Sequence, residues 1–313
     1  MPRILVVAPN WIGDALMAQP LLGRLRARDS SAAIDVLAPD WVAPVARRMP
    51  EVSEVIAAPL RHGELQLAER RRLARELKSR AYEQAFVLPN TWKSALIPFF
   101  AGIPRRTGYV GELRYGLLND ARKTARVPMA EHYARLAGEG PTPQPRLRVS
   151  PEEIEPVKRR FGIEGAYAAL CPGAEYGPAK RWPYFAELAG RLPLPAVLLG
   201  SPGDAAAAAN VGGTNLVGRT SLDDAVVLLA GAAFVVSNDS GLMHVAAALG
   251  RPQLALFGSS SPERTPPQSA AARVLWLRVE CSPCYQRECP LGHFRCMREM
   301  TVEMVLNQVG ALT

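Results

Sequence analysis

The sequence predicts an α/β protein with two doubly wound, Rossmann-like domains that face one another across a cleft. Short apolar, β-branched runs alternate with helix-like segments throughout the 313 residues, a pattern typical of a parallel sheet covered by helices. A segment rich in Pro and Gly and without apolar periodicity, 138–153, indicates a linker. We therefore expect one domain over 1–150 and another over 151–313, with ligands bound beyond the carboxyl ends of the strands.

The expected strands are brief apolar runs. They fall at 4–8, 34–38, 55–57 and 85–88 before the linker, and at 168–171, 196–200, 215–218, 234–237 and 254–258 after it. No G-x-G-x-x-G follows the first strand, and no G-x-x-x-x-G-K-[ST] occurs in the sequence. An ordinary dinucleotide-binding fold and a P-loop are therefore not supported.

Hydropathy and charge limit where the protein can be located in the cell and which partners it can bind. No apolar run approaches the roughly 18 residues of a membrane-spanning helix, and Asn10 and Asp14 interrupt the first run too early for a signal peptide, so we expect a cytoplasmic protein. The net charge is +8, but residues 1–150 hold 23 Lys and Arg against 14 Asp and Glu. This half is expected to meet nucleic acid, an anionic membrane or a phosphorylated substrate, although its Arg-rich segment 69–80 indicates a solvated helix face.

The turn after strand 234–237 is a candidate phosphate site. Asn238, Asp239 and Ser240 connect the strand to a helix, whose first N–H groups and positive dipole end favour an anion. Gly241 allows close approach to the backbone, and His244 lies one turn into the helix, where it can donate a hydrogen bond. The alternative is that Asp239 or Ser240 only caps the helix and that His244 is an internal histidine.

A second candidate loop, 171–183, follows the first strand of the second domain. Gly173 and Gly177 shape a loop that ends in Lys180 and Arg181. A lysine here can neutralise a diphosphate and stabilise negative charge on a leaving group. A solvated Lys-Arg pair is the alternative.

The third candidate is Asp14, in or just before the first turn of the helix after strand 4–8. A carboxylate at this edge can accept the proton of an attacking hydroxyl, or it can merely complement the helix dipole. The sequence has no HExxH motif and no Ser-His-Asp order or carboxylate pair in a recognisable setting that would offer competing chemistry.

Four of the five cysteines cluster near the C-terminus, at Cys281, Cys284, Cys289 and Cys296. In a cytoplasmic protein they are expected to be thiols, packed locally or binding a metal with His293 as a further ligand. The C-x2-C-x4-C-x6-C spacing does not reproduce the paired knuckles of common zinc modules. Both alternatives remain open at this point.

Four ordered motifs resemble a known family. "PNWIGDALMAQPLL", "PGAEYGPAKRWP", "SNDSGLMHVAAALG" and "FGSSSPERTPP" are similar to signatures of the ADP-heptose:lipopolysaccharide heptosyltransferases, most closely the heptosyltransferase II group. The resemblance implies a GT-B glycosyltransferase that binds the acceptor mainly in its first domain and the nucleotide-sugar in its second. It implies inverting transfer of L-glycero-D-manno-heptose from ADP-heptose to the first heptose of the lipopolysaccharide inner core, at the cytoplasmic face of the inner membrane.

The resemblance also assigns roles to individual residues. It implies that Asp14 is the general base and that Lys180 contacts the diphosphate. The implied donor-binding residues are Gly173, Lys180, Asp204, Asp239, Ser240, Gly241 and His244. Neither a metal nor a cofactor is expected, since helix N-termini, Lys180 and His244 would supply the positive charge at the diphosphate.

The basic first half suits an acceptor that carries Kdo carboxylates and lipid A phosphates above an anionic bilayer. The candidate acceptor contacts are Lys93, Arg105, Arg106 and Arg114. The apolar segment 95–104 is either a membrane-interface segment or a buried core helix.

Alternative functions stay open within and beyond this family. The protein can be a heptosyltransferase I or III that acts at a neighbouring core position, because family members share donor machinery and differ in acceptor loops. A two-lobed protein that only binds an anionic ligand is the non-enzymatic alternative. Nucleic-acid binding is not expected, because no basic motif is interleaved with aromatic residues. Acceptor regiochemistry, oligomeric state and the membrane docking surface are not predicted.

Overall fold

The chain divides into two compact units between Pro145 and Arg146 in a computed structural model, which describes residues 1–61 and 63–312. The boundary lies five residues before the expected one, because the backbone N–H of Leu147 already donates to the carbonyl of Ala248 in the second unit, 3.0 Å away. The expected linker also extends too far. Its last three residues belong to helix α6, which Ser150 caps through a reciprocal capping box.

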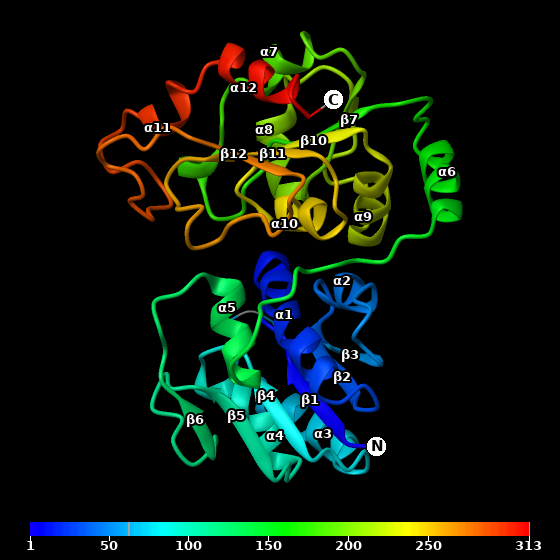
Figure 1. Cartoon of the computed structure of the whole chain (residues 1–313), viewed down its shortest axis with the longest axis vertical. Helices are drawn as coiled ribbons and strands as arrows, with labels where there is room; N and C mark the ends of the chain where they lie inside the picture. Colours follow the sequence, from blue (N-terminus) through cyan, green and yellow to red (C-terminus); the bar gives the residue numbers. More distant parts are fainter. Residues whose placement is uncertain (62, 313) are drawn as a thin grey trace. The chain divides into compact units, whose positions relative to one another are not determined.

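The first unit contains a six-stranded parallel sheet with the order β3-β2-β1-β4-β5-β6 (Figure 1). The strands are β1 (Arg3–Val7), β2 (Ala33–Pro39), β3 (Glu54–Ala58), β4 (Gln84–Val87), β5 (Arg105–Tyr109) and β6 (Asp120–Arg122). The last two strands were not expected. Both lack an apolar run: β5 reads RRTGY and β6, the edge strand, reads DAR.

Helices pack in pairs against this sheet, α1 with α5 and α3 with α4. The bounds are α1 (Ile12–Arg28), α2 (Ala43–Arg47), α3 (Leu67–Lys78), α4 (Leu96–Phe100) and α5 (Met129–Ala134), with short 3-10 turns η1 (Trp92–Ala95) and η2 (Arg135–Ala137). The core joins Leu5 and Val87 of the sheet to Leu73 of α3. The solvated Arg-rich face expected for α3 is present, since Arg71, Arg72, Arg75 and Lys78 are exposed. Arg70 is the exception, because it is buried with its guanidinium on the carbonyl oxygens of Leu65 and Lys93.

The second unit repeats the same architecture with the order β12-β11-β10-β7-β8-β9. Its strands are β7 (Ala168–Cys171), β8 (Ala196–Leu198), β9 (Thr214–Asn215), β10 (Phe234–Asn238), β11 (Gln253–Phe257) and β12 (Ala272–Trp276). Counted from its own first strand, this sheet has the same 3-2-1-4-5-6 order as the first unit. Strand β12 was not expected because it lies at an edge and is only partly buried.

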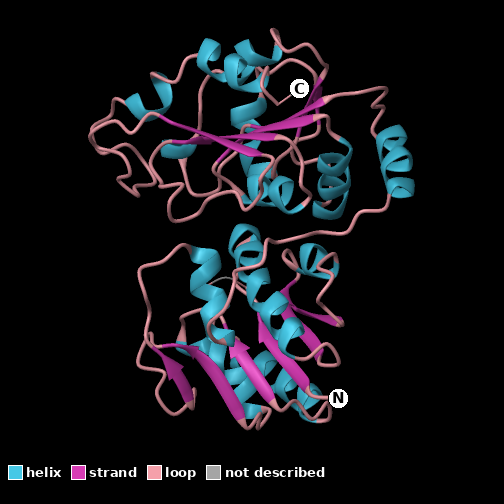
Figure 2. Cartoon of the chain, viewed as in Figure 1, coloured by secondary structure: helices cyan, strands magenta, loops and turns pink. Residues whose placement is uncertain are grey.

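Helices cover both faces of the second sheet, with α9 and α10 on one side and α7 and α12 on the other (Figures 1 and 2). The helices are α6 (Pro151–Arg160), α7 (Phe185–Ala189), α8 (Ala205–Ala208), α9 (Leu222–Gly231), α10 (Gly241–Ala248), α11 (Arg295–Arg298) and α12 (Val302–Val309), with turns η3 (Pro178–Lys180) and η4 (Pro202–Asp204). Every residue of α10 from Met243 to Ala248 is buried, so this helix is held firmly by the core.

Each sheet has one point at which the strand order reverses, between β1 and β4 in the first unit and between β7 and β10 in the second. The loops at the carboxyl ends of these two strands diverge and leave room for a ligand. Among the described residues, no helix combines the length and the apolar character that crossing a bilayer requires.

Candidate active site

The loops after β7 and β10 meet at the reversal point of the second sheet. Asn238, the last residue of β10, is fully buried and connects the two loops. Its side-chain amide donates to the carbonyl of Pro172 at 2.7 Å and accepts from the backbone N–H of Trp182 at 3.1 Å. No role was expected for Asn238 from the sequence, although it stands directly beside Asp239. Its hydrogen bonds hold the Lys180 loop against the turn that begins α10.

Lys180 and Asp239 form an ion pair across this reversal point. The ammonium group lies 2.6 Å from Oδ2 of Asp239, and the side chains are only 15% and 6% exposed. The hydroxyl of Ser260, in the loop after β11, donates to the same carboxylate oxygen. Sequence reasoning missed Ser260, which lies in the "FGSSSPERTPP" motif but carries no charge to single it out. Lys180 is therefore not part of a solvated pair.

The first turn of α10 keeps its N–H groups available to a ligand. Ser240 occupies the N-cap position, yet in the described chain its side chain makes no capping hydrogen bond and lies 3.2 Å from the hydroxyl of Ser237 instead. Asp239 is engaged by Lys180. The capping alternative for these two residues was therefore wrong, and the positive end of the helix dipole adjoins the ammonium of Lys180.

His244 is uncharged at neutral pH. Its side chain is 6% exposed, and burial lowers its pKa to about 4, with a further lowering by Lys180 that Asp239 opposes. The expectation that His244 supplies positive charge was therefore wrong. A neutral imidazole still has one N–H to donate to an anion.

Asp204 packs directly against Gly173. A Cβ on Gly173 would lie 2.1 Å from Cγ of Asp204, so only glycine fits here. One carboxylate oxygen of Asp204 accepts from the backbone N–H and the hydroxyl of Ser201, at 2.9 and 2.7 Å. The other is buried without a hydrogen-bond partner in the described chain, 4.0 Å from the guanidinium of Arg181. Thus Gly173 provides space for Asp204, which leaves one acceptor oxygen unused.

In the first unit, Asp14 and Lys93 lie at the carboxyl ends of β1 and β4. Asp14 is in the first turn of α1 and is half-buried. Lys93 lies in η1, and its ammonium donates to the carbonyl of Glu64 at 3.2 Å. Both residues therefore flank the reversal point of the first sheet, where a ligand is expected.

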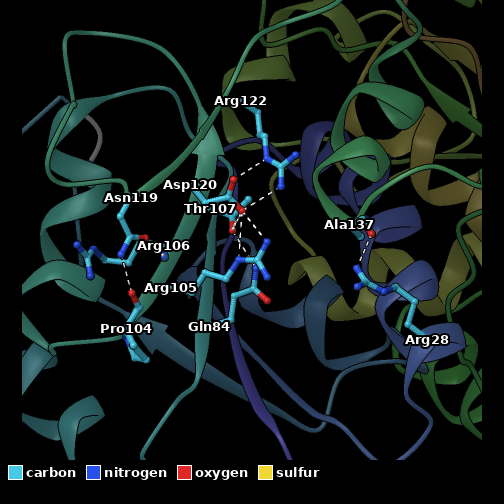
Figure 3. Close-up of polar contacts among 10 residues, drawn as sticks. All are labelled: Arg28, Gln84, Pro104, Arg105, Arg106, Thr107, Asn119, Asp120, Arg122 and Ala137. Carbon is cyan, nitrogen blue, oxygen red and sulfur yellow. Dashed lines mark hydrogen bonds and ion pairs between the residues drawn. The ribbon is translucent and has the colours of Figure 1, made fainter.

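Two of the three candidate arginines, Arg105 and Arg106, lie elsewhere (Figure 3). Arg105 and Arg106 begin β5, where Arg105 aligns through Gln84 with Ile4, near the start of β1. They therefore lie toward the amino edge of the sheet rather than the carboxyl edge that carries Asp14. Arg105 pairs with Asp120 at 2.9 Å, and Arg106 donates to carbonyl oxygens within its own unit. The structure therefore does not bring these two arginines to Asp14.

Arg114 is a structural residue, which contradicts its expected role in acceptor binding. It is 2% exposed, and its guanidinium donates to the carbonyl oxygens of Tyr109 and Pro89. Burial lowers its pKa to about 10. The apolar segment 95–104 is likewise core over Ala95–Pro98, while Phe99 is 42% exposed.

The C-terminal cysteines line one small cavity together with His293. Cys281, Cys284 and Cys289 are half-buried, Cys296 is buried, and all are free thiols. Burial raises the pKa of Cys296 to about 11. Within residues 1–61 and 63–312, no three His, Cys, Asp or Glu side chains are grouped so as to hold a metal ion.

Comparison with known proteins identifies the family. The sequence model of glycosyltransferase family 9 (heptosyltransferase) matches residues 70–295. The chain belongs to this family. It is 44% identical to lipopolysaccharide heptosyltransferase 2 of Escherichia coli K12, over 99% of this chain and 98% of that protein. It is 38% identical to lipooligosaccharide heptosyltransferase 2 of Haemophilus influenzae, over 99% of both.

A solved structure agrees with this assignment. The structure of E. coli ADP-heptose lipopolysaccharide heptosyltransferase II superimposes with a TM-score of 0.88 at 42% identity, covering 99% of this chain and 98% of that one. The expected GT-B fold with two Rossmann-like units is confirmed, and this family 9 member is a heptosyltransferase. Its assignment to an enzyme family removes the alternative of a protein that only binds a ligand.

Proposed function

We propose that this enzyme transfers L-glycero-D-manno-heptose from ADP-heptose to the first heptose of the lipopolysaccharide inner core, with inversion at the transferred carbon. The observation that carries the proposal is the Lys180–Asp239 ion pair beside the uncapped first turn of α10, at the reversal point of the second sheet. This arrangement suits a diphosphate. Relatives named heptosyltransferase 2 match almost the whole chain, which supports this donor and this acceptor.

The donor diphosphate would occupy the amino end of α10. N–H groups of Gly241 and its neighbours donate to the phosphate oxygens, and the ammonium of Lys180 neutralises charge that grows on ADP as it leaves. Neutral His244 contributes a hydrogen bond but no charge. Gly173 holds Asp204 in place, and the unused Asp204 oxygen accepts from a hydroxyl of the nucleotide ribose.

Asp239 has a different role from direct donor contact. A carboxylate beside a diphosphate repels it unless a cation compensates, and Lys180 supplies that cation at 2.6 Å. Asp239 and Ser260 therefore position the ammonium of Lys180 at the turn. Ser240, at the N-cap, supplies backbone and hydroxyl groups next to the same phosphate.

Asp14 is the proposed general base. The acceptor hydroxyl attacks the anomeric carbon, its proton passes to the Asp14 carboxylate, and the bond from that carbon to the diphosphate oxygen breaks, which releases ADP. A hydroxyl is too weak an acid to ionise unaided near neutral pH, so the carboxylate must act as the bond forms. Attack from the face opposite the leaving group inverts the configuration.

The proposed acceptor is acidic, with Kdo carboxylates and lipid A phosphates. Lys93, at the same sheet edge as Asp14, is its proposed contact. The basic surplus of residues 1–150 supports peripheral attachment to the cytoplasmic face of the inner membrane. We propose no nucleic-acid partner, and salt-sensitive binding to arbitrary duplex DNA would contradict this.

A neighbouring acceptor position is the second candidate, because lipopolysaccharide heptosyltransferase 1 of Pseudomonas aeruginosa is 28% identical over 92% of this chain. The deciding experiment incubates the protein with ADP-heptose and a panel of truncated core acceptors, then locates the new linkage. The proposal expects a product only when the first heptose is present, with the second heptose attached to it. Transfer to an acceptor that ends in Kdo would assign heptosyltransferase I activity instead.

A further inference from the structure

The tryptophans of this protein are unevenly placed. Of five in the sequence, Trp11, Trp41 and Trp92 are 46%, 42% and 42% exposed, whereas Trp182 is 2% exposed and Trp276 is half-buried. All three exposed tryptophans belong to the first unit. A large apolar side chain left in water at three sites of one unit indicates a surface that a ligand covers.

The three exposed tryptophans follow adjacent strands of one sheet. Trp41 comes two residues after β2, Trp11 comes four residues after β1, and Trp92 comes five residues after β4. Because β2, β1 and β4 are neighbours and parallel, all three side chains arise at the carboxyl edge, in a row. Neighbouring strands lie about 4.8 Å apart, so the row spans the width of a few sugar rings.

Local contacts fix these residues. The indole N–H of Trp41 donates to the carbonyl of Asn10 at 2.7 Å, which joins the loop after β2 to the loop after β1. Trp11 is the N-cap of α1, three residues before Asp14. The backbone N–H of Trp92 donates to the Glu112 carboxylate at 3.0 Å. The middle of the row therefore lies beside the proposed base, and the indole of Trp41 is held in place before any ligand arrives.

We propose that Trp11, Trp41 and Trp92 form a platform that binds the saccharide part of the acceptor by packing indole faces against the C–H faces of sugar rings. The inference rests on the proposed function, since it deepens acceptor binding. Indole rings suit this ligand because they are flat, apolar on their faces and polar at one edge. The segment after β1 carries Trp11 and Asp14, and the segment after β4 carries Trp92 and Lys93. Residues that can stack on a sugar and residues that can recognise charge therefore lie at the same edge of the sheet.

A bilayer is the competing occupant, and position argues against it. The platform adjoins the residue proposed to take the acceptor proton, so lipid seated on it would exclude the sugar that must react. The exposed Phe99 is in α4, which leads to the opposite, amino edge of the sheet. Phe99 matches the tryptophans in exposure and unit but lies outside the platform, which makes it the matched control.

The test measures binding of a delipidated core oligosaccharide that ends in the first heptose, by titration calorimetry without donor. We expect Trp11→Ala, Trp41→Ala and Trp92→Ala each to raise the Kd by about three- to tenfold, the range of aromatic contacts. The corresponding Phe variants are expected to stay within about twofold of wild type because they keep an aromatic face. Phe99→Ala should bind like wild type, and the affinity for ADP should be unchanged in every variant.

The outcomes separate this inference from the proposed function. Unchanged oligosaccharide affinity in all three Ala variants, or no binding by wild type, would overturn the platform. So would variants that bind the oligosaccharide normally but lose binding to phosphatidylglycerol–phosphatidylethanolamine vesicles, which would assign the row to the membrane. If the wild type binds this saccharide through its tryptophans yet transfers heptose only to a different acceptor, the proposed function fails and the platform stands.

Discussion

The carboxyl edges of the two sheets differ although the sheets share one strand order. In the second unit Asp239 and Lys180 at this edge are largely buried and already paired, and Ser260 donates to the same carboxylate. In the first unit the same edge is open and aromatic, with Trp11, Trp41 and Trp92 exposed. The same architecture thus provides a preorganised site that suits a small charged ligand in one unit and an open surface that suits a larger ligand in the other. The two sites differ in the loops that follow the strands.

Preorganisation of the second site makes the free energy of folding less favourable. Burying Asp239 and Lys180 removes both from water, and only their mutual attraction and the Ser260 hydroxyl compensate. The exposed tryptophans of the first unit are uncharged and remain partly in water, so they bear no comparable cost of removing charges from water. Substitutions in the second unit should therefore change stability together with donor binding, whereas those on the platform should change binding alone.

The largest combined effect on stability and donor binding is expected for Lys180→Met. This change leaves the Asp239 carboxylate buried without its cation, and we expect a loss of about 3 kcal/mol in the free energy of unfolding, with at least tenfold weaker binding of ADP. Urea denaturation and ADP titration measure the two effects. In Lys180→Met/Asp239→Asn the stability should recover while ADP binding stays weak. A single variant as stable as wild type would show that the edge is not preorganised by this pair.

Arg114→Met is expected to reduce the free energy of unfolding by about 3 kcal/mol, because it leaves the buried carbonyl oxygens of Tyr109 and Pro89 without donors. The exposed side chain of Arg105 pairs with Asp120, so Arg105→Gln should change the free energy of unfolding by less than about 0.5 kcal/mol. Denaturation of the two variants compares a buried and an exposed arginine of the same unit. Equal effects would contradict the separation of structural from surface arginines.

His244 predicts a pH dependence of stability. Its pKa is about 4 in the folded protein and about 6.5 when unfolded, so the unfolded chain binds the proton first as the pH falls. Stability is therefore lost as the pH falls from about 6.5 to about 4, by up to about 3 kcal/mol from this group. His244→Gln should remove this part of the slope in denaturation series. A slope identical to wild type would mean that His244 titrates normally.

Gly173→Ala is expected to reduce the free energy of unfolding by about 1–3 kcal/mol, because its methyl group must displace Asp204. Gly203→Ala is the control, since a Cβ there lies 3.6 Å from its nearest neighbour, the Ser201 hydroxyl. Adding Asp204→Ala to Gly173→Ala should recover part of the loss. Thermal denaturation that finds both glycine variants equally stable would contradict the close packing.

The sequence was most informative where a site is encoded locally. The strand-to-helix turn at Asp239 and the Gly-rich loop before Lys180 each lie within about fifteen residues of an apolar strand, so periodicity alone places them at a sheet edge. The same holds for Asp14 in the first turn of α1. Their order along the chain does not reveal that Lys180 and Asp239 touch, because β7 and β10 are neighbours only in the folded sheet.

Arginine positions were predicted poorly for a physical reason. Arg114 and Arg70 sit in charged, polar segments that indicate a surface, yet each long side chain reaches buried carbonyl oxygens. Arg105 and Arg106 begin a strand that lacks an apolar run, so the sequence could not show which sheet edge they occupy. The charge of His244 was wrong because burial, which lowers its pKa, depends on the packed core.

Asp14→Asn is the decisive test of the claim that the first unit supplies the general base and the second unit binds the donor. We expect transfer from ADP-heptose to slow by about 10²- to 10⁴-fold, because the general base is lost, while the Kd for ADP stays within about twofold of wild type. Asp29→Asn, at the other end of α1, should leave both quantities unchanged. Wild-type turnover in Asp14→Asn, or a loss of ADP affinity equal to the loss of turnover, would show that Asp14 is not the base.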